Sequence, residues 1–166
     1  MLKRLAGLGW IGCLLCAVGA VLLAVLANLY IIVARPFGAT LGIPIDQTGP
    51  VGAVIAAIVP YVWLFLYAGM GTTFWLLAAK DQRMSGRAWL VVALVLLCVG
   101  YPVYTGSLNQ PIVALIGNGV VIAVAAIAVW AIWPISKRGA GLLVPVIAWV
   151  SLASVALVAL ITGRTF

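Results

Sequence analysis

One stripe of side chains near the middle of the chain has the types and spacing for ligand recognition. Pro60, Trp63, Tyr67 and Met70 recur at intervals that place them on one face of an α-helix. The stripe combines a helix-bending proline with an indole N–H and a phenol, where an ordinary lipid-facing surface would carry leucine and valine. We interpret it as a surface that packs against other helices or against a flat ligand.

A second stripe lies near the C-terminus and contains Pro145, Trp149 and Ala156 at helical spacing. Such a stripe is typical of a helix–helix seam, and a seam can also form one wall of a pocket. Trp63 and Trp149 both fall inside apolar segments rather than at their ends. Two interpretations are open for them: bulky fillers of a helical core, or aromatic walls of a ligand pocket.

Two asparagines and one tyrosine are the candidate polar contacts. Asn118 stands between two glycines in an apolar segment, and Asn28 interrupts another. An asparagine facing lipid would be costly, so we expect Asn118 to make an interhelical hydrogen bond, with a ligand contact as the alternative. Tyr67 could hydrogen-bond a carbonyl freed by the proline or a bound ligand.

The residues that the chain lacks exclude several kinds of chemistry. It has no histidine, and its two acidic residues, Asp46 and Asp81, fall between the apolar segments. A proton relay across a membrane, a metal site and general acid–base catalysis therefore have no obvious side chains to use. We expect no catalytic residues, no metal, no required cofactor and no enzymatic activity. The three cysteines are interpreted as small apolar packing residues.

The composition indicates an integral membrane protein. The chain has 166 residues, of which 67% are hydrophobic and 7% are charged, whereas a soluble domain carries roughly 25% charged residues. We predict an all-α integral membrane protein: a single domain over residues 1–166, built as a five-transmembrane-helix bundle. The predicted spans are residues 10–33, 50–79, 88–105, 111–133 and 140–162. The connecting segment 34–49 is either a simple connector or a lid over the bundle.

The distribution of charge predicts the topology. Five spans place seven basic residues on the side of the N-terminus and two on the other, which predicts the N-terminus inside and the C-terminus outside. The net charge of +7 therefore indicates contact with the lipid bilayer and not with nucleic acid. Aromatic residues near the span ends are expected to be interfacial anchors: Trp10, Tyr30, Trp89, Tyr101, Tyr104, Trp130 and Trp133.

Three motifs in order along a five-span chain resemble the TspO/MBR family, known as translocator protein, tryptophan-rich sensory protein or peripheral benzodiazepine receptor. The resemblance covers about residues 60–160. The motifs are Pro60-x-x-Trp63-x-x-x-Tyr67-x-x-Met70-Gly71, Pro102-Val103-Tyr104-x-Gly106 and Gly141-Leu142-Leu143-Val144-Pro145-x-x-x-Trp149-Val150.

The resemblance implies a five-helix bundle, often a homodimer, in a membrane that we expect to be the bacterial cell membrane. It also implies a pocket, capped by the first loop, for porphyrins and hydrophobic drug-like or sterol ligands. On the matching positions, Trp63 and Trp149 would be pocket tryptophans, Tyr67 would line the cavity, and Pro60 and Pro145 would shape it.

The chain departs from the family pattern at several positions. The family's tryptophan-rich entry to the second helix is replaced by residues 50–54, which contain no tryptophan. Leu97 and Gly100 stand where the family usually has asparagine and tryptophan, and Val146 replaces a tyrosine. The resemblance is therefore to a divergent member that lacks several polar pocket groups.

The sequence thus favours a membrane-embedded binding, transport or sensory protein for a flat hydrophobic ligand, a porphyrin or other tetrapyrrole or a sterol-like molecule. Asn28 and Asn118 would supply polar contacts to it. The alternative is a non-catalytic accessory or assembly subunit of a membrane complex. A third hypothesis, light-driven breakdown of porphyrin, would need only tryptophans.

Overall fold

The computed structural model describes residues 7–34, 50–81, 85–108 and 110–162. Its helices are α2 (Trp10–Ala34), α3 (Pro50–Asp81), α4 (Gly86–Leu108), α5 (Pro111–Ile132) and α6 (Lys137–Ile161). Each contains a segment long and apolar enough to cross a membrane, and the described residues include no strand. The predicted five-helix membrane bundle is confirmed.

All helix boundaries lie within three residues of the predicted spans, and each of the two that differ by three residues has a local cause. α4 continues through Gly106 to Leu108, since helices in lipid tolerate glycine when their other backbone groups stay bonded. α6 begins at Lys137 rather than at 140. The preceding residue, Ser136, accepts a hydrogen bond at its Oγ from the Gly139 amide (3.2 Å), as helix N-cap residues do.

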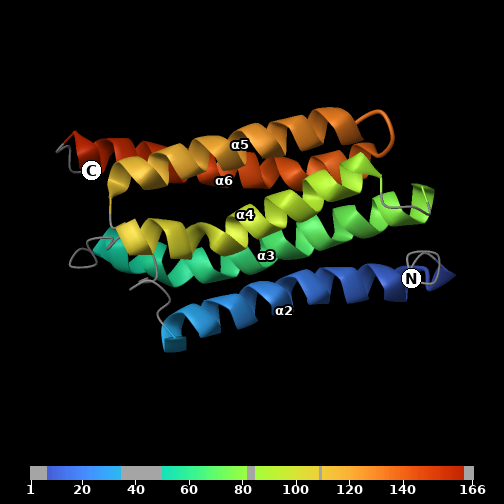
Figure 1. Ribbon diagram of the computed structural model, residues 1–166, viewed down its shortest axis with the longest axis horizontal. Helices are drawn as coiled ribbons and strands as arrows, with labels where there is room; N and C mark the ends of the chain where they lie inside the picture. The colour runs from blue at the N-terminus through green and yellow to red at the C-terminus, as the bar shows by residue number, and fades with distance from the viewer. Residues whose placement is uncertain (1–6, 35–49, 82–84, 109, 163–166) are drawn as a thin grey trace.

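The helices run alternately in opposite directions, so the start of α2 and the end of α6 lie at opposite ends of the bundle (Figure 1). They form a ring in which α2 contacts α3, α3 contacts α6, α6 contacts α5, α5 contacts α4, and α4 contacts α2. A further contact joins α3 and α4 across the ring. This order makes α3 and α6 neighbours, although they are far apart in sequence.

The core is shared mainly by α3, α4, α5 and α6. Its largest fully buried side chains include Leu66, Met70, Leu77, Leu94, Ile132 and Leu143. α2 lies at the edge of the bundle beside α3 (Figure 1), and only Gly12, Ala24 and Ile31 are buried in it. Its other face is exposed and apolar, as expected of a helix that faces lipid.

All basic residues in the described part of the chain lie at one end of the bundle, which we call the basic end. They are Lys80, Arg87, Lys137 and Arg138. Lys80 Nζ donates to the Ile135 carbonyl, and Arg87 Nε donates to the Ala131 carbonyl (2.9 Å). Arg87 thereby bonds a carbonyl in the last turn of α5, at the negative end of its dipole, and Lys80 bonds the turn that follows.

The other predictions for the connecting segments concern residues that the structure does not describe. These include the lid at 35–49, Asp46, and the basic residues Lys3, Arg4, Arg35, Arg83 and Arg164. The side chains of Asp81 and Tyr104 are likewise not described. Of the predicted interfacial anchors, Trp10, Tyr30, Trp89, Trp130 and Trp133 are exposed at or near helix ends.

Candidate ligand site

The seam between α3 and α6 is a close contact with a fixed register. A Cβ placed on Gly69 would lie 3.3 Å from the Leu142 carbonyl oxygen, so the two backbones approach closely there. One turn further on, the fully buried Thr73 hydroxyl lies 2.9 Å from the Gly69 oxygen and 3.0 Å from the Gly139 oxygen. Thr73 therefore links α3 to the first turn of α6.

This register places Trp63 and Trp149 at the same level of the bundle. Trp63 lies ten residues before Thr73 on α3, and Trp149 lies ten residues after Gly139 on α6. Because α3 and α6 run in opposite directions (Figure 1), both steps lead the same way along the bundle by about 15 Å. The two tryptophans that sequence analysis singled out are thus level with each other on neighbouring helices.

The aromatic side chains at this level are only partly covered by the protein. Trp63 and Trp149 are half-buried, and both pack against the hydrophobic core. Tyr67, one turn from Trp63, is 4% exposed, and the two rings lie 5.7 Å apart between centroids at an interplanar angle of 33°. Such offset pairs give large apolar contact areas with a defined geometry.

The contact of α2 with α3 positions Asn28. At Gly71 an added Cβ would lie 2.8 Å from the Cys16 carbonyl carbon and 2.9 Å from the Ala17 Cα, so only glycine fits. Asn28 lies eleven residues after Ala17 on α2, and Pro60 lies eleven residues before Gly71 on α3. Since α2 and α3 run in opposite directions (Figure 1), Asn28 and Pro60 lie at the same level of the bundle. Asn28 is half-buried, and its Nδ2 donates to the Ala24 carbonyl of its own helix (2.8 Å). Pro60 is exposed, and α3 continues through it as one helix.

Asn118 makes the interhelical hydrogen bond expected of it. Its Nδ2 donates to Ser154 Oγ on α6 (3.0 Å), and that hydroxyl donates to the Val150 carbonyl (2.8 Å). Asn118 is buried, so its amide is satisfied within the bundle by α6. Sequence analysis had not singled out Ser154; it is the second of two serines, after Ser151, in the apolar part of α6.

The predicted site residues therefore share one zone along the bundle axis. Pro145, which is half-buried, and the Asn118–Ser154 pair mark its two limits, about 14 Å apart at 1.5 Å per helical residue. Within this zone Trp63, Tyr67 and Trp149 pack against the core, the two tryptophans only in part, whereas Pro60 is exposed. The zone offers aromatic surface and a few polar groups, an arrangement suited to burial and stacking of an apolar ligand.

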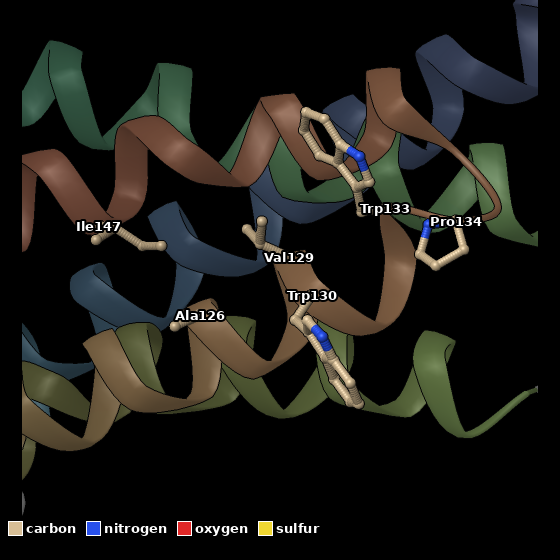
Figure 2. A pocket seen from close by; sticks show the side chains of 6 residues that line it. All are labelled: Ala126, Val129, Trp130, Trp133, Pro134 and Ile147. Carbon is tan, nitrogen blue, oxygen red and sulfur yellow. The ribbon is translucent and has the colours of Figure 1, made fainter.

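A groove on the outer surface extends from the basic end to Ile147, about half a turn around α6 from both Pro145 and Trp149. It has a volume of about 440 Å³ and runs along the outer surface of α5 and α6 (Figure 2). Its lining residues are Ala126, Val129, Trp130, Trp133, Pro134 and Ile147. Sequence analysis had interpreted the two tryptophans only as interfacial anchors; their close spacing, followed directly by proline, was the available signal for a surface feature.

The cysteines lie in the helices and not in a cluster of metal ligands. Cys98 is buried, and Cys13 and Cys16 are half-buried on α2. Cys13 Sγ lies 3.9 Å from Thr72 Oγ1 across the α2–α3 contact. Among the described residues, no three histidine, cysteine or acidic side chains come together.

Comparison with known proteins places the helices α3 to α6 in one family. The model described as TspO/MBR family matches residues 47–162, about seven tenths of the chain. Searches of curated proteins and of solved structures each gave no match. The matched region contains all three motifs of the resemblance, together with the α3–α6 seam and the paired levels of Trp63 and Trp149. The chain belongs to the TspO/MBR family.

Proposed function

We propose that the protein binds a flat hydrophobic ligand, a tetrapyrrole or a sterol-like molecule, between α3 and α6, and acts in its transport or sensing. The observation that carries this proposal is the pair of half-buried tryptophans, Trp63 and Trp149, at one level on these two neighbouring helices. Family membership supports a role within the membrane.

The binding energy would come from covering the exposed parts of the two indoles. Trp63 is already held against Tyr67, so little conformational entropy is lost when a ligand stacks on it. If the ligand covers ~50 Å² of each indole, at ~25 cal/mol per Å² each ring contributes about 1 kcal/mol. Two rings together then change the affinity by roughly 25-fold.

Polar recognition would be limited, since few polar groups lie near this level. The Asn118–Ser154 pair begins about 7.5 Å beyond Trp149 along α6, and Asn28 lies level with Pro60. A ligand with a hydroxyl or carbonyl at one end could exchange hydrogen bonds with these amides. Specificity would therefore depend mainly on shape, which suits a rigid polycyclic ligand.

The test is a titration of detergent-solubilised protein with protoporphyrin. Binding is measured by the absorbance of the porphyrin, because this signal does not depend on the tryptophans that are replaced. If each phenylalanine keeps about half of the covered ring area, the double variant Trp63→Phe, Trp149→Phe loses about 1 kcal/mol and should bind roughly fivefold more weakly. The control is Trp10→Phe, Trp89→Phe, which changes two exposed rings and should leave the affinity within about twofold. An unchanged dissociation constant in a folded double variant rules out this site.

The same preparation discriminates between the other candidate functions. A wild-type protein that binds neither protoporphyrin nor a sterol, and that copurifies with a stoichiometric partner, would be an accessory subunit. Loss of porphyrin absorbance under illumination, abolished in the double variant, would indicate light-driven breakdown. The homodimer implied by the family resemblance is tested by the mass of the protein in detergent.

We also propose that the basic end faces the inside of the cell, with the N-terminus on that side. The four described basic residues all lie at this end, and an excess of lysine and arginine marks the cytoplasmic side of membrane proteins.

A further inference from the structure

The groove on α5 and α6 is open toward the surroundings of the bundle. Figure 2 shows the indoles of Trp130 and Trp133 on either side of Val129, with Pro134 toward the α5–α6 turn and Ile147 on α6. Trp130 is 79% exposed and Trp133 is 50% exposed. The lining is almost entirely apolar, so in a bilayer the groove must be filled by a hydrophobic chain.

The depth of the groove matches one leaflet of a membrane. It extends from Pro134, in the turn at the basic end, to Ile147 on α6. Ile147 lies ten residues after Lys137, which is about 15 Å along the helix and half of a ~30 Å hydrocarbon core. A single acyl chain that enters from the surface at the basic end would therefore run the length of the groove.

The charge at the mouth of the groove is positive. Lys137 and Arg138 are exposed at the first turn of α6, whereas Lys80 and Arg87 already bond backbone carbonyls nearby. The described side chains include no carboxylate; Asp81, the last residue of α3, is the acidic residue of this end. A phosphate would find complementary charge here.

Lys137 and Arg138 lie on different sides of α6. At 100° per residue, Lys137 lies about 80° around α6 from the groove residue Ile147, whereas Arg138 lies on the opposite side of the helix. A headgroup whose acyl chain occupies the groove is therefore placed nearer to Lys137.

We propose that this groove binds one acyl chain of an anionic phospholipid from the leaflet at the basic end, with its phosphate paired to Lys137. The inference does not depend on the proposed function, since it concerns a different surface. A second copy of the chain is the less suitable occupant. A two-fold axis along the membrane normal, with the groove at the interface, would bring Lys137 of both copies to the same end of the bundle, where like charges repel.

The test is competition between phosphatidylglycerol and phosphatidylcholine with identical acyl chains. Protein is equilibrated with an equimolar mixture in detergent, and the lipid retained on the protein is measured by native mass spectrometry. The wild type should retain phosphatidylglycerol about fivefold over phosphatidylcholine, the effect of roughly one lysine near a headgroup. Lys137→Gln should remove this preference, and Arg138→Gln should keep most of it.

A steric variant tests the acyl chain separately from the headgroup. Ala126→Phe fills the groove from its exposed lining and should reduce retention of both lipids severalfold. Ala123→Phe, an exposed position on α5 that does not line the groove, is the matched control and should have no effect. Thermal unfolding of each variant verifies that the bundle is intact.

Three results would overturn the proposal. The first is equal retention of the two lipids by the wild type. The second is an equal loss of preference in Lys137→Gln and Arg138→Gln, which would mean a diffuse surface charge. The third is unchanged lipid retention in Ala126→Phe; if that variant instead changes the oligomeric state, the groove is an interface between copies.

Discussion

The contact at Gly71 predicts how tightly α2 is held to the bundle. The variant Gly71→Ala adds a Cβ that would lie 2.8 Å from the Cys16 carbonyl carbon and 2.9 Å from the Ala17 Cα. Carbon atoms in good contact are about 3.5–4.0 Å apart, so α2 must retreat by roughly 0.7 Å or more. The atoms in the way belong to the backbone and cannot rotate aside, which makes the cost larger than at a side-chain contact.

The expected free-energy change follows from two opposing effects. Overpacking of this kind costs up to about 3 kcal/mol, and replacing glycine by alanine in a helix returns about 1 kcal/mol. The net loss of about 2 kcal/mol corresponds to a melting temperature roughly 4–8 °C lower for a chain of this size. Gly19→Ala is the control, since nothing lies within 4 Å of the Cβ it would add; it should be neutral or stabilising.

A disulfide reports the displacement directly. Cys13 Sγ lies 3.9 Å from Thr72 Oγ1, so Thr72→Cys should form a disulfide with Cys13 in a background where Cys16 and Cys98 are alanine. Adding Gly71→Ala should slow this oxidation severalfold, and adding Gly19→Ala should not. An unchanged oxidation rate together with an unchanged melting temperature would refute the close packing of α2 on α3.

Three further predictions concern the polar contacts and the topology. Thr73→Val should lower the stability by about 1 kcal/mol in thermal unfolding, because it removes the hydroxyl that bonds the Gly139 carbonyl. The control Thr72→Val should cost less. A double-mutant cycle on Asn118→Ala and Ser154→Ala should give a coupling of about 0.6 kcal/mol; a value of zero would mean that the two side chains do not interact. Single cysteines at Ser85 and Gln110, at opposite ends of the bundle, should react with impermeant thiol reagents from opposite sides of the membrane, and Ser85 from the inside.

The fold could be predicted because composition and segment length leave few alternatives in a membrane. Five long apolar segments can only be helices there, since a backbone group without a partner costs several kcal/mol in lipid. The ends of the helices were harder to predict. Ser136 caps α6, but a single serine between a proline and two basic residues resembles an ordinary loop. Lys80 and Arg87 were interpreted as topological signals, whereas Arg87 also bonds the last turn of α5 and Lys80 bonds the turn after it.

The candidate site could be predicted only as a set of residue types. Aromatic and proline stripes on two segments pointed to Trp63 and Trp149, but their relative height depends on the register of α3 against α6. That register is set by Gly69 and by the hydroxyl of Thr73, two residues that belong to neither stripe. Pro60 shows that helical spacing alone can also mislead. Its spacing placed it on the stripe of Trp63, but in the structure its side chain is exposed.

The register therefore links the stability of the bundle to the proposed ligand site. A slip of one helical turn between α3 and α6 would separate the levels of Trp63 and Trp149 by about 5.4 Å, more than the thickness of a stacked ring. Thr73 lies about 15 Å along the bundle from the level of both tryptophans. It would act on binding by holding the two helices in register. Thr73→Val should then weaken porphyrin binding as well as stability. Gly71→Ala disturbs a different seam, so it should affect stability with little change in that affinity. Equal losses of affinity in the two variants would mean that binding follows overall stability and not the α3–α6 register.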